Sequence, residues 1–284
     1  MFHKRTTREA DDAPEFEAWE VAEMGGADRW STWDTPTAGQ RGPKPYPDWL
    51  VTELAAADRE LGILKTGKEA DVFLVERGVP RTSRFCVLAA KRYRASQHRL
   101  FHRDAGYLEG RRVRESRDNR AMAKRTTTGM QMIASQWANA EFGALYRMYE
   151  LGVPVPYPVQ ILGTELMLEF IGEANERQAA PRLAQLRPER DELSNLWDQL
   201  VAAVGLMARA GFAHGDLSAY NILVHNGRLV LIDLPQIVDV VSNPQGPDFL
   251  RRDASNVARW FTSRGMDVSG DDLATELIAE ANIR

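Results

Sequence analysis

Alternating apolar and polar positions dominate the first half of the chain and predict strands. Residues 62–77, GILKTGKEADVFLVER, have the pattern of strand, tight turn and strand, and residues 85–93, FCVLAAKRY, predict a third strand. Two further strands are expected at 159–162 (VQIL) and 166–170 (LMLEF). Upstream of all these, apolar residues and alanines from Trp49 to Glu60 have helical spacing, so we expect a helix there.

Helical spacing is more common in the second half. We expect helices at about 132–151, 189–211, 248–264 and 271–282, and Gly211 should end the second of them. Between the second and third helices, ILV at 222–224 and LVLI at 229–232 flank His225-Asn226-Gly227-Arg228. Asn-Gly between two apolar runs is the strongest short-range signal for a β-hairpin, and we expect one at this point.

Composition narrows the class of protein. The 284 residues carry a formal charge of −4, which argues against a protein that coats nucleic acid over its whole surface. Residues 91–125 differ, because they hold twelve Lys or Arg against four Asp or Glu. The single cysteine, Cys86, excludes a disulfide framework and suits a buried thiol in a reducing compartment. No signal-peptide core and no run of about eighteen apolar residues is present, so we expect a cytoplasmic protein without membrane contact.

Residues 1–47 are rich in Gly, Pro and acidic side chains and have little apolar periodicity. We therefore expect a mostly disordered acidic arm. Trp19, Trp30 and Trp33 lie within it. These tryptophans could dock on a partner as aromatic anchors, or they could pack back on their own domain.

Three polar residues around the expected hairpin have the spacing of a phosphoryl-transfer site. Asp216 lies five residues before Asn221, and Asp233 directly follows the second apolar run. Phosphoryl transfer needs one carboxylate at the attacking oxygen, plus an amide and a second carboxylate on the Mg²⁺ that bridges the phosphates of ATP. A hairpin brings Asn221 and Asp233 to the same end. The alternative is an ordinary hairpin with turn-stabilising Asp and Asn.

A second group of candidates comes from the N-terminal strands. Lys91 at the end of a strand can reach the α- and β-phosphates, and Glu141 in the expected helix at 132–151 is a candidate partner for it. A solvated lysine and a surface glutamate are the alternative. Thr66, Gly67 and Lys68 occupy the place of a phosphate-covering loop, with exposed backbone N–H groups expected at Gly67. One glycine in place of G-x-G-x-x-G would equally suit a plain hairpin turn.

With these elements in order, the chain resembles the RIO family of atypical protein kinases over about residues 50–265. The resemblance is carried by TGKEADVFLV, AAKRY, MLEFIG, HGDLSAYNILV, IDLPQ and FLRRDASNVARWF. H-x-D followed by Asn, and a GVPVP segment, also occur in aminoglycoside and related small-molecule phosphotransferases. The RIO pattern is distinguished by TGKEA in place of a glycine-rich loop, by Ser218 after HGDL, and by Pro235-Gln236 after the metal aspartate.

The resemblance implies an α+β, two-lobed protein-kinase-like fold. Residues 48–171 would form a small N-lobe with an antiparallel sheet, one main helix and a basic mobile insertion at about 94–130. Residues 172–284 would form a mostly helical C-lobe without the long activation segment of ordinary protein kinases. Residues 1–47 cannot build the winged helix of one RIO subgroup, so the type one subgroup is the nearer one.

The resemblance also implies roles for individual residues. Asp216 would be the catalytic base, Lys91 with Glu141 would orient the phosphates, and Asn221 and Asp233 would hold Mg²⁺ or Mn²⁺. Met167 would be the gatekeeper beside the adenine, whose edge would bind the backbone of Glu169 and Ile171. The implied ATP-contacting residues are Thr66, Gly67, Lys68, Lys91, Met167, Glu169, Ile171, Ser218, Asn221 and Asp233.

The implied activity is ATP- and Mg²⁺-dependent serine/threonine kinase chemistry with autophosphorylation and ATPase activity. Because Ser218 stands where ordinary kinases have a lysine, we expect slow phosphorylation of free peptides. Some family members pass phosphate to the metal aspartate, which would be Asp233. The basic stretch 91–125 could contact RNA or a ribosomal particle, or be a solvated surface. A small-molecule phosphotransferase and a nucleotide-binding assembly factor with little catalysis remain as alternatives.

Overall fold

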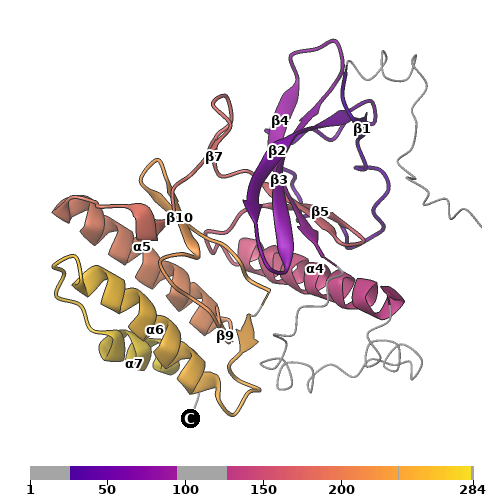
Figure 1. Ribbon diagram of the computed structural model, residues 1–284. Coiled ribbons are helices and arrows are strands. Elements are labelled where there is room, and N and C mark those ends of the chain that lie inside the picture. The colour runs from indigo at the N-terminus through magenta and orange to yellow at the C-terminus, as the bar shows by residue number, and fades with distance from the viewer. Residues whose placement is uncertain (1–25, 95–126, 236, 283–284) are drawn as a thin grey trace, which may run out of the picture.

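The computed structural model of the chain describes residues 26–94, 127–235 and 237–282. Figure 1 shows a twisted sheet beside a helical half, with helix α4 (Thr127–Glu150) running along the sheet. This helix contacts β4, β5 and β6 of the sheet. The arrangement confirms the expected protein-kinase-like fold, with an N-lobe of antiparallel sheet and one helix and a helical C-terminal part.

The N-lobe sheet has six strands in the order β1-β2-β3-β4-β6-β5, and every neighbouring pair is antiparallel. Its strands are β1 (Arg29–Trp30), β2 (Ala57–Thr66), β3 (Ala70–Gly78), β4 (Phe85–Tyr93), β5 (Pro158–Leu162) and β6 (Glu165–Glu169). Short polar turns between alternating segments explain why β2, β3 and β4 pair in sequence.

The expected helix from Trp49 to Glu60 is wrong. Strand β2 already begins at Ala57, and no helix is assigned to the described residues before it. Asp58 lies opposite Arg77 in the register of β2 and β3, and the two side chains form a buried ion pair. Cross-strand pairing therefore outweighs the helical preference of the local alanines.

The expectation of disorder is wrong for residues 26–47. The Trp33 side chain is only 7% exposed and packs with Leu50, Val51 and Tyr157. Backbone bonds join this segment to β5, since Gly42 N–H donates to Val159 O at 3.0 Å. Burial of an aromatic ring accounts for the order, and for Trp33 it supports the alternative in which the tryptophan packs on its own domain, whereas Trp30 is 37% exposed. Trp19 lies outside the described residues.

The helical half contains α5 (Arg190–Arg209), α6 (Gly246–Thr262) and α7 (Gly270–Glu280), close to the expected positions. Gly211 follows α5 with a φ of +83°, as expected for a glycine at a helix end. The remaining elements are β7 (Gly172–Glu173), β8 (Gln178–Ala179), η2 (Leu183–Gln185), β9 (Phe212–Ala213), β10 (Ile222–His225), β11 (Arg228–Leu231) and β12 (Val238–Asp239).

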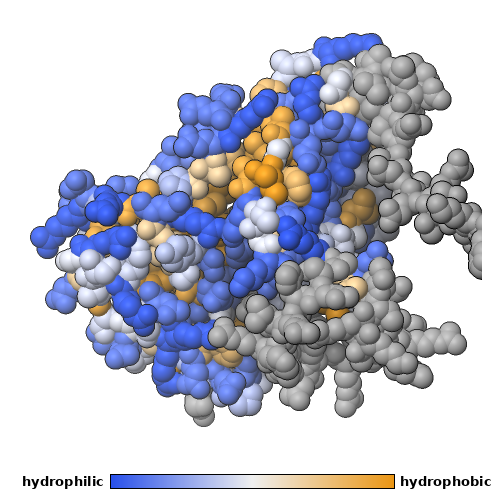
Figure 2. Space-filling model, viewed as in Figure 1, coloured by the Kyte–Doolittle hydropathy of each residue, from blue (hydrophilic) through white to orange (hydrophobic). Residues whose placement is uncertain are grey.

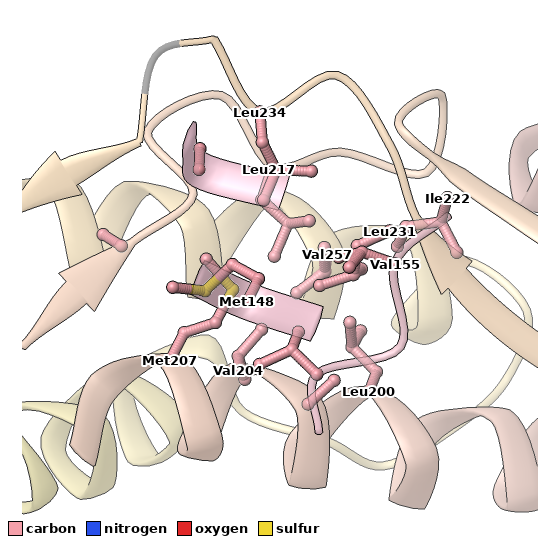
Figure 3. Close-up of a cluster of buried hydrophobic side chains, with 14 of the residues drawn as sticks. Met148, Val155, Leu200, Val204, Met207, Leu217, Ile222, Leu231, Leu234 and Val257 are labelled. Carbon is pink, nitrogen blue, oxygen red and sulfur yellow. The ribbon is translucent and has the colours of Figure 1, made fainter. Parts of the chain in front are cut away.

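Apolar side chains from both halves share one core. Figure 3 shows Met148 of α4 beside Leu200, Val204 and Met207 of α5. In the view of Figure 2, further apolar residues gather where the edge of the sheet faces the helical half. Among the residues that the structure describes, no helix has the length and apolar character to cross a membrane.

Candidate active site

The loop that carries Asp216 and Asn221 lies between β9 and β10. Leu217 and Ile222 of this loop are buried in the core drawn in Figure 3, whereas Asp216, between the buried Gly215 and Leu217, is exposed. The Asn221 side-chain Nδ2 donates to the backbone oxygen of Asp216 at 2.8 Å. Asn221 N–H donates to Ser218 O at 2.9 Å. These two bonds fix the expected base and the expected metal ligand relative to each other.

Helix α6 is bonded to the backbone of this loop through Asp253. The Asp253 carboxylate accepts from Gly215 N–H at 2.8 Å and from Leu217 N–H at 3.0 Å. Burial is the main reason why the pKa of Asp253 is raised, although these bonds oppose the shift. Arg252 Nη2 also donates to Gly215 O. Asp253 belongs to no site motif in the sequence, but a carboxylate on the apolar stripe of α6 is a usable signal.

Asp233 lies just beyond β11 and beside Asn221. Ile232 N–H donates to Asn221 O at 3.0 Å, so the hairpin brings the two expected metal ligands to one end, as predicted. Asp233 has a φ of +62°, a conformation that non-glycine residues seldom adopt and that is frequent at functional sites. Figure 3 shows Leu231 and Leu234 on either side of it turned into the core.

Lys91 of β4 forms ion pairs with two carboxylates. Its Nζ lies 2.7 Å from Glu141 Oε1 and 2.7 Å from Asp233 Oδ1, so the predicted pair with Glu141 is present. Glu141 is 1% exposed, and it also accepts a hydrogen bond from the Tyr93 hydroxyl. Burial alone would lower the pKa of Lys91, but the charges of Glu141 and Asp233 outweigh burial and raise it.

Neighbouring cations determine the protonation state of Asp233. Burial opposes its ionisation, but the adjacent Lys91, followed by Lys65 and Arg182, holds the pKa of Asp233 below its usual value. Asp233 is thus ionised at neutral pH.

The turn between β2 and β3 differs in detail from the expectation. Gly67 N–H donates to Ala70 O at 3.0 Å, so it is not free for a phosphate. A Cβ at Gly67 would lie 2.7 Å from that oxygen, which explains the glycine. Thr66 and Lys68 are exposed, and the cation that approaches Asp233 is Lys65, with Nζ 3.9 Å from Oδ2. The sequence analysis did not single out Lys65.

The residues expected at the adenine lie on β6 and just after it. Met167 is fully buried, and its Sδ lies 3.1 Å from Nη2 of Arg77. Glu169 N–H donates to Tyr157 O, and Ile171 O accepts from Ala180 N–H, both at 2.9 Å. Of the expected backbone contacts, the Glu169 N–H and the Ile171 carbonyl are therefore already bonded within the protein.

The donor set suits Mg²⁺. Among the described residues, no cluster of three His, Cys, Asp or Glu side chains could hold a metal ion. Mg²⁺ is usually held by one or two carboxylates with substrate phosphates and water, and Asn221 and Asp233 supply oxygen atoms at one place. Gln236 and residues 95–126 of the insertion expected at about 94–130 lie outside the described residues, while residues 127–130 belong to α4.

A family comparison agrees with this geometry. Residues 82–273 match the model of the RIO domain. The RIO-type serine/threonine-protein kinase Rio1 of Haloferax volcanii is 36% identical over 213 residues, which cover 75% of this chain and 66% of that protein. Serine/threonine-protein kinase RIO1 of Saccharomyces cerevisiae is 32% identical over 77% of this chain and 47% of its own length. The chain thus covers less than two thirds of these relatives.

A solved structure shows the same fold. The Rio2 kinase from Chaetomium thermophilum, in a complex with ADP/Mg²⁺ and phosphoaspartate, aligns with a TM-score of 0.53. The alignment covers 76% of this chain and 62% of the other, at 21% sequence identity. Fold, site geometry and sequence similarity agree, and the chain belongs to the RIO domain kinase family.

Proposed function

We propose that this chain is an ATP- and Mg²⁺-dependent serine/threonine kinase that autophosphorylates and hydrolyses ATP. The observation that carries the proposal is the position of Lys91, 2.7 Å from both Glu141 and Asp233. It joins the N-lobe sheet and helix to the metal-binding end of the hairpin, an arrangement that phosphoryl transfer requires. The names of the similar proteins support the same activity.

Each residue has a defined task in this reaction. The oxygen of an attacking hydroxyl bonds to the γ-phosphorus, its proton passes to Asp216, and the bond to the leaving ADP oxygen breaks. Lys91 orients the phosphates, while Asn221 and Asp233 supply oxygen ligands. Mg²⁺, when bound, offsets the charge that develops on the transferred group.

Asp233 is a second group to which the γ-phosphoryl group of ATP could be transferred. The similar Rio2 complex contains phosphoaspartate. In this chain the pKa of Asp233 is low, so its carboxylate can attack the γ-phosphorus without losing a proton, and ADP leaves. Water would then cleave the acyl phosphate and complete a cycle of ATP hydrolysis.

An RNA or ribosomal-particle contact through residues 91–125 remains a prediction. Lys91 binds Glu141 and Asp233, while Arg92 binds Glu60 and Glu165. These two cations of the stretch are therefore already paired with carboxylates of the protein. The rest of the charge lies almost entirely at 95–126, outside the described residues.

The test is transfer of the labelled γ-phosphate of ATP to the protein, with and without Mg²⁺. The variants are Asp216→Asn and Asp233→Asn, and Asp248→Asn is the control because its carboxylate on α6 is 73% exposed. An aspartyl phosphate would be supported if hydroxylamine removed the label from the unaltered chain and if Asp233→Asn acquired no label. Stable label that requires Asp216 would support serine/threonine autophosphorylation. Neither label nor hydrolysis would contradict the proposal, and turnover only with an added aminoglycoside would favour a small-molecule phosphotransferase.

A further inference from the structure

Two cations outside the predicted site residues approach Asp233 from opposite halves. Lys65, near the end of β2, has its Nζ 3.9 Å from Asp233 Oδ2. Arg182 directly precedes η2 and forms a β-bridge with Leu223 of β10. Its Nη1 donates to the backbone oxygen of Tyr220, inside the loop that carries Asp216 and Asn221. The guanidinium is thus attached to this loop one residue before Asn221.

Geometry places these cations at one end of the hairpin. The Nζ atoms of Lys65 and Lys91 lie 3.9 Å and 2.7 Å from the Asp233 carboxylate, and Arg182 is bonded to the residue next to Asn221. Three cations therefore surround the end of the hairpin, and such a cluster attracts a further anion.

Arg182 also has suitable chemistry. An arginine has five N–H donors in a planar fork, and a bond to Tyr220 uses one of them. The others can bind two oxygens of one phosphate, which a neutral hydroxyl cannot do. Ser218, where ordinary kinases have a lysine, supplies only such a hydroxyl.

We propose that Arg182, assisted by Lys65, binds the terminal phosphate of ATP and replaces the cation that is missing at Ser218. This inference rests on the proposed kinase function and adds a residue to it. ADP lacks the phosphate that Arg182 would hold. The pair therefore distinguishes ATP from ADP, because only the γ-phosphate would be bound at once by a cation from the sheet and by one from the helical half.

The experiment compares the affinities for ATP and ADP, each with Mg²⁺, by calorimetric titration of the full chain. Arg182→Gln removes the charge and keeps a polar side chain with N–H donors. We expect ATP affinity to fall about tenfold and ADP affinity less than about twofold. Lys65→Met should weaken ATP binding by about threefold, because the Lys65 side chain is 49% exposed.

Arg187→Gln is the matched control, since Arg187 is exposed, lies five residues further along, and interacts electrostatically with Arg264. Equal losses of ATP and ADP affinity in Arg182→Gln would overturn the inference, because they would show that Arg182 only positions the loop. Unchanged affinities for both nucleotides in Arg182→Gln would overturn it as well. If the unaltered chain bound neither nucleotide, the kinase proposal itself would fail.

Discussion

A buried ion pair in the N-lobe provides the most direct test of the energetics. Arg77 is 0% exposed and Asp58 is 1% exposed, and two bonds of 2.7 and 3.1 Å join them. Asp58→Asn keeps the volume of the side chain but removes its charge, and it places an amide group among the N–H donors of Arg77. Removing one partner of a buried pair typically costs about 3–5 kcal/mol, because the other charge stays buried.

The assay is equilibrium unfolding in urea, followed by tryptophan fluorescence and circular dichroism. We expect the free energy of unfolding to fall by about 3–5 kcal/mol in Asp58→Asn. The control is Glu76→Gln, on the residue next to Arg77. Glu76 pairs with Arg59, the neighbour of Asp58, at 3.7 Å on the surface, and the change should cost no more than about 0.5 kcal/mol.

A double variant, Asp58→Leu with Arg77→Met, separates charge from packing. Both charges are then replaced by apolar groups, so more than half of the free energy of unfolding lost in Asp58→Asn should be recovered. Gln160 loses its 3.0 Å bond from Arg77 in this variant. The reasoning would be refuted if the free energy of unfolding of Asp58→Asn fell by less than about 1 kcal/mol while its slope against urea concentration stayed unchanged. It would mean that water or a shifted side chain stabilises Arg77 after the change.

Three further predictions concern single groups. Glu141→Gln should lower the rate of phosphate transfer about tenfold or more, because Lys91 would then be held by Asp233 alone; an unchanged rate in the transfer assay would contradict this. Asp253→Asn should lower both the stability and the transfer rate, since an amide replaces an oxygen that accepts a backbone N–H, and a normal melting temperature would count against it. Burial raises the pKa of Cys86 from 9.0 to about 11, so its contribution to stability is complete below pH 9 and is lost as pH rises through 11. The buried thiol should also resist labelling at pH 8 until urea is added, and fast labelling of the native chain would show that it is accessible.

Local patterns were sufficient to predict the hairpin of β10 and β11. Asn226 and Gly227 both have positive φ values, as a tight turn between β10 and β11 requires. With the turn fixed, the spacing of Asn221 and Asp233 brings them to one end without any distant contact. The pair of Lys91 and Glu141 was predictable for a different reason, because a strand-end lysine in this fold needs a carboxylate on the facing helix.

Long-range contacts were not predictable from local spacing. Asp58 looks like part of a helix until Arg77 is placed opposite it in the sheet. Trp33 is buried only because Leu50 and Tyr157 come together from distant parts of the chain. Arg182 and Lys65 likewise have no sequence signal of their own, since their common feature is nearness to Asp233 in the folded chain.

The position of Glu141 explains how Asp233 could change partner when a nucleotide binds. Lys91 is bound on one side by Glu141, which is buried and also bonded by Tyr93, and on the other by the more exposed Asp233. The side-chain exposures of 1% and 33% make Asp233 the easier partner to release. A phosphate oxygen would then take the place of Asp233 beside Lys91, and the Asp233 carboxylate would be available to hold Mg²⁺. Each group keeps an opposite charge throughout, so the exchange needs no buried charge to stand alone.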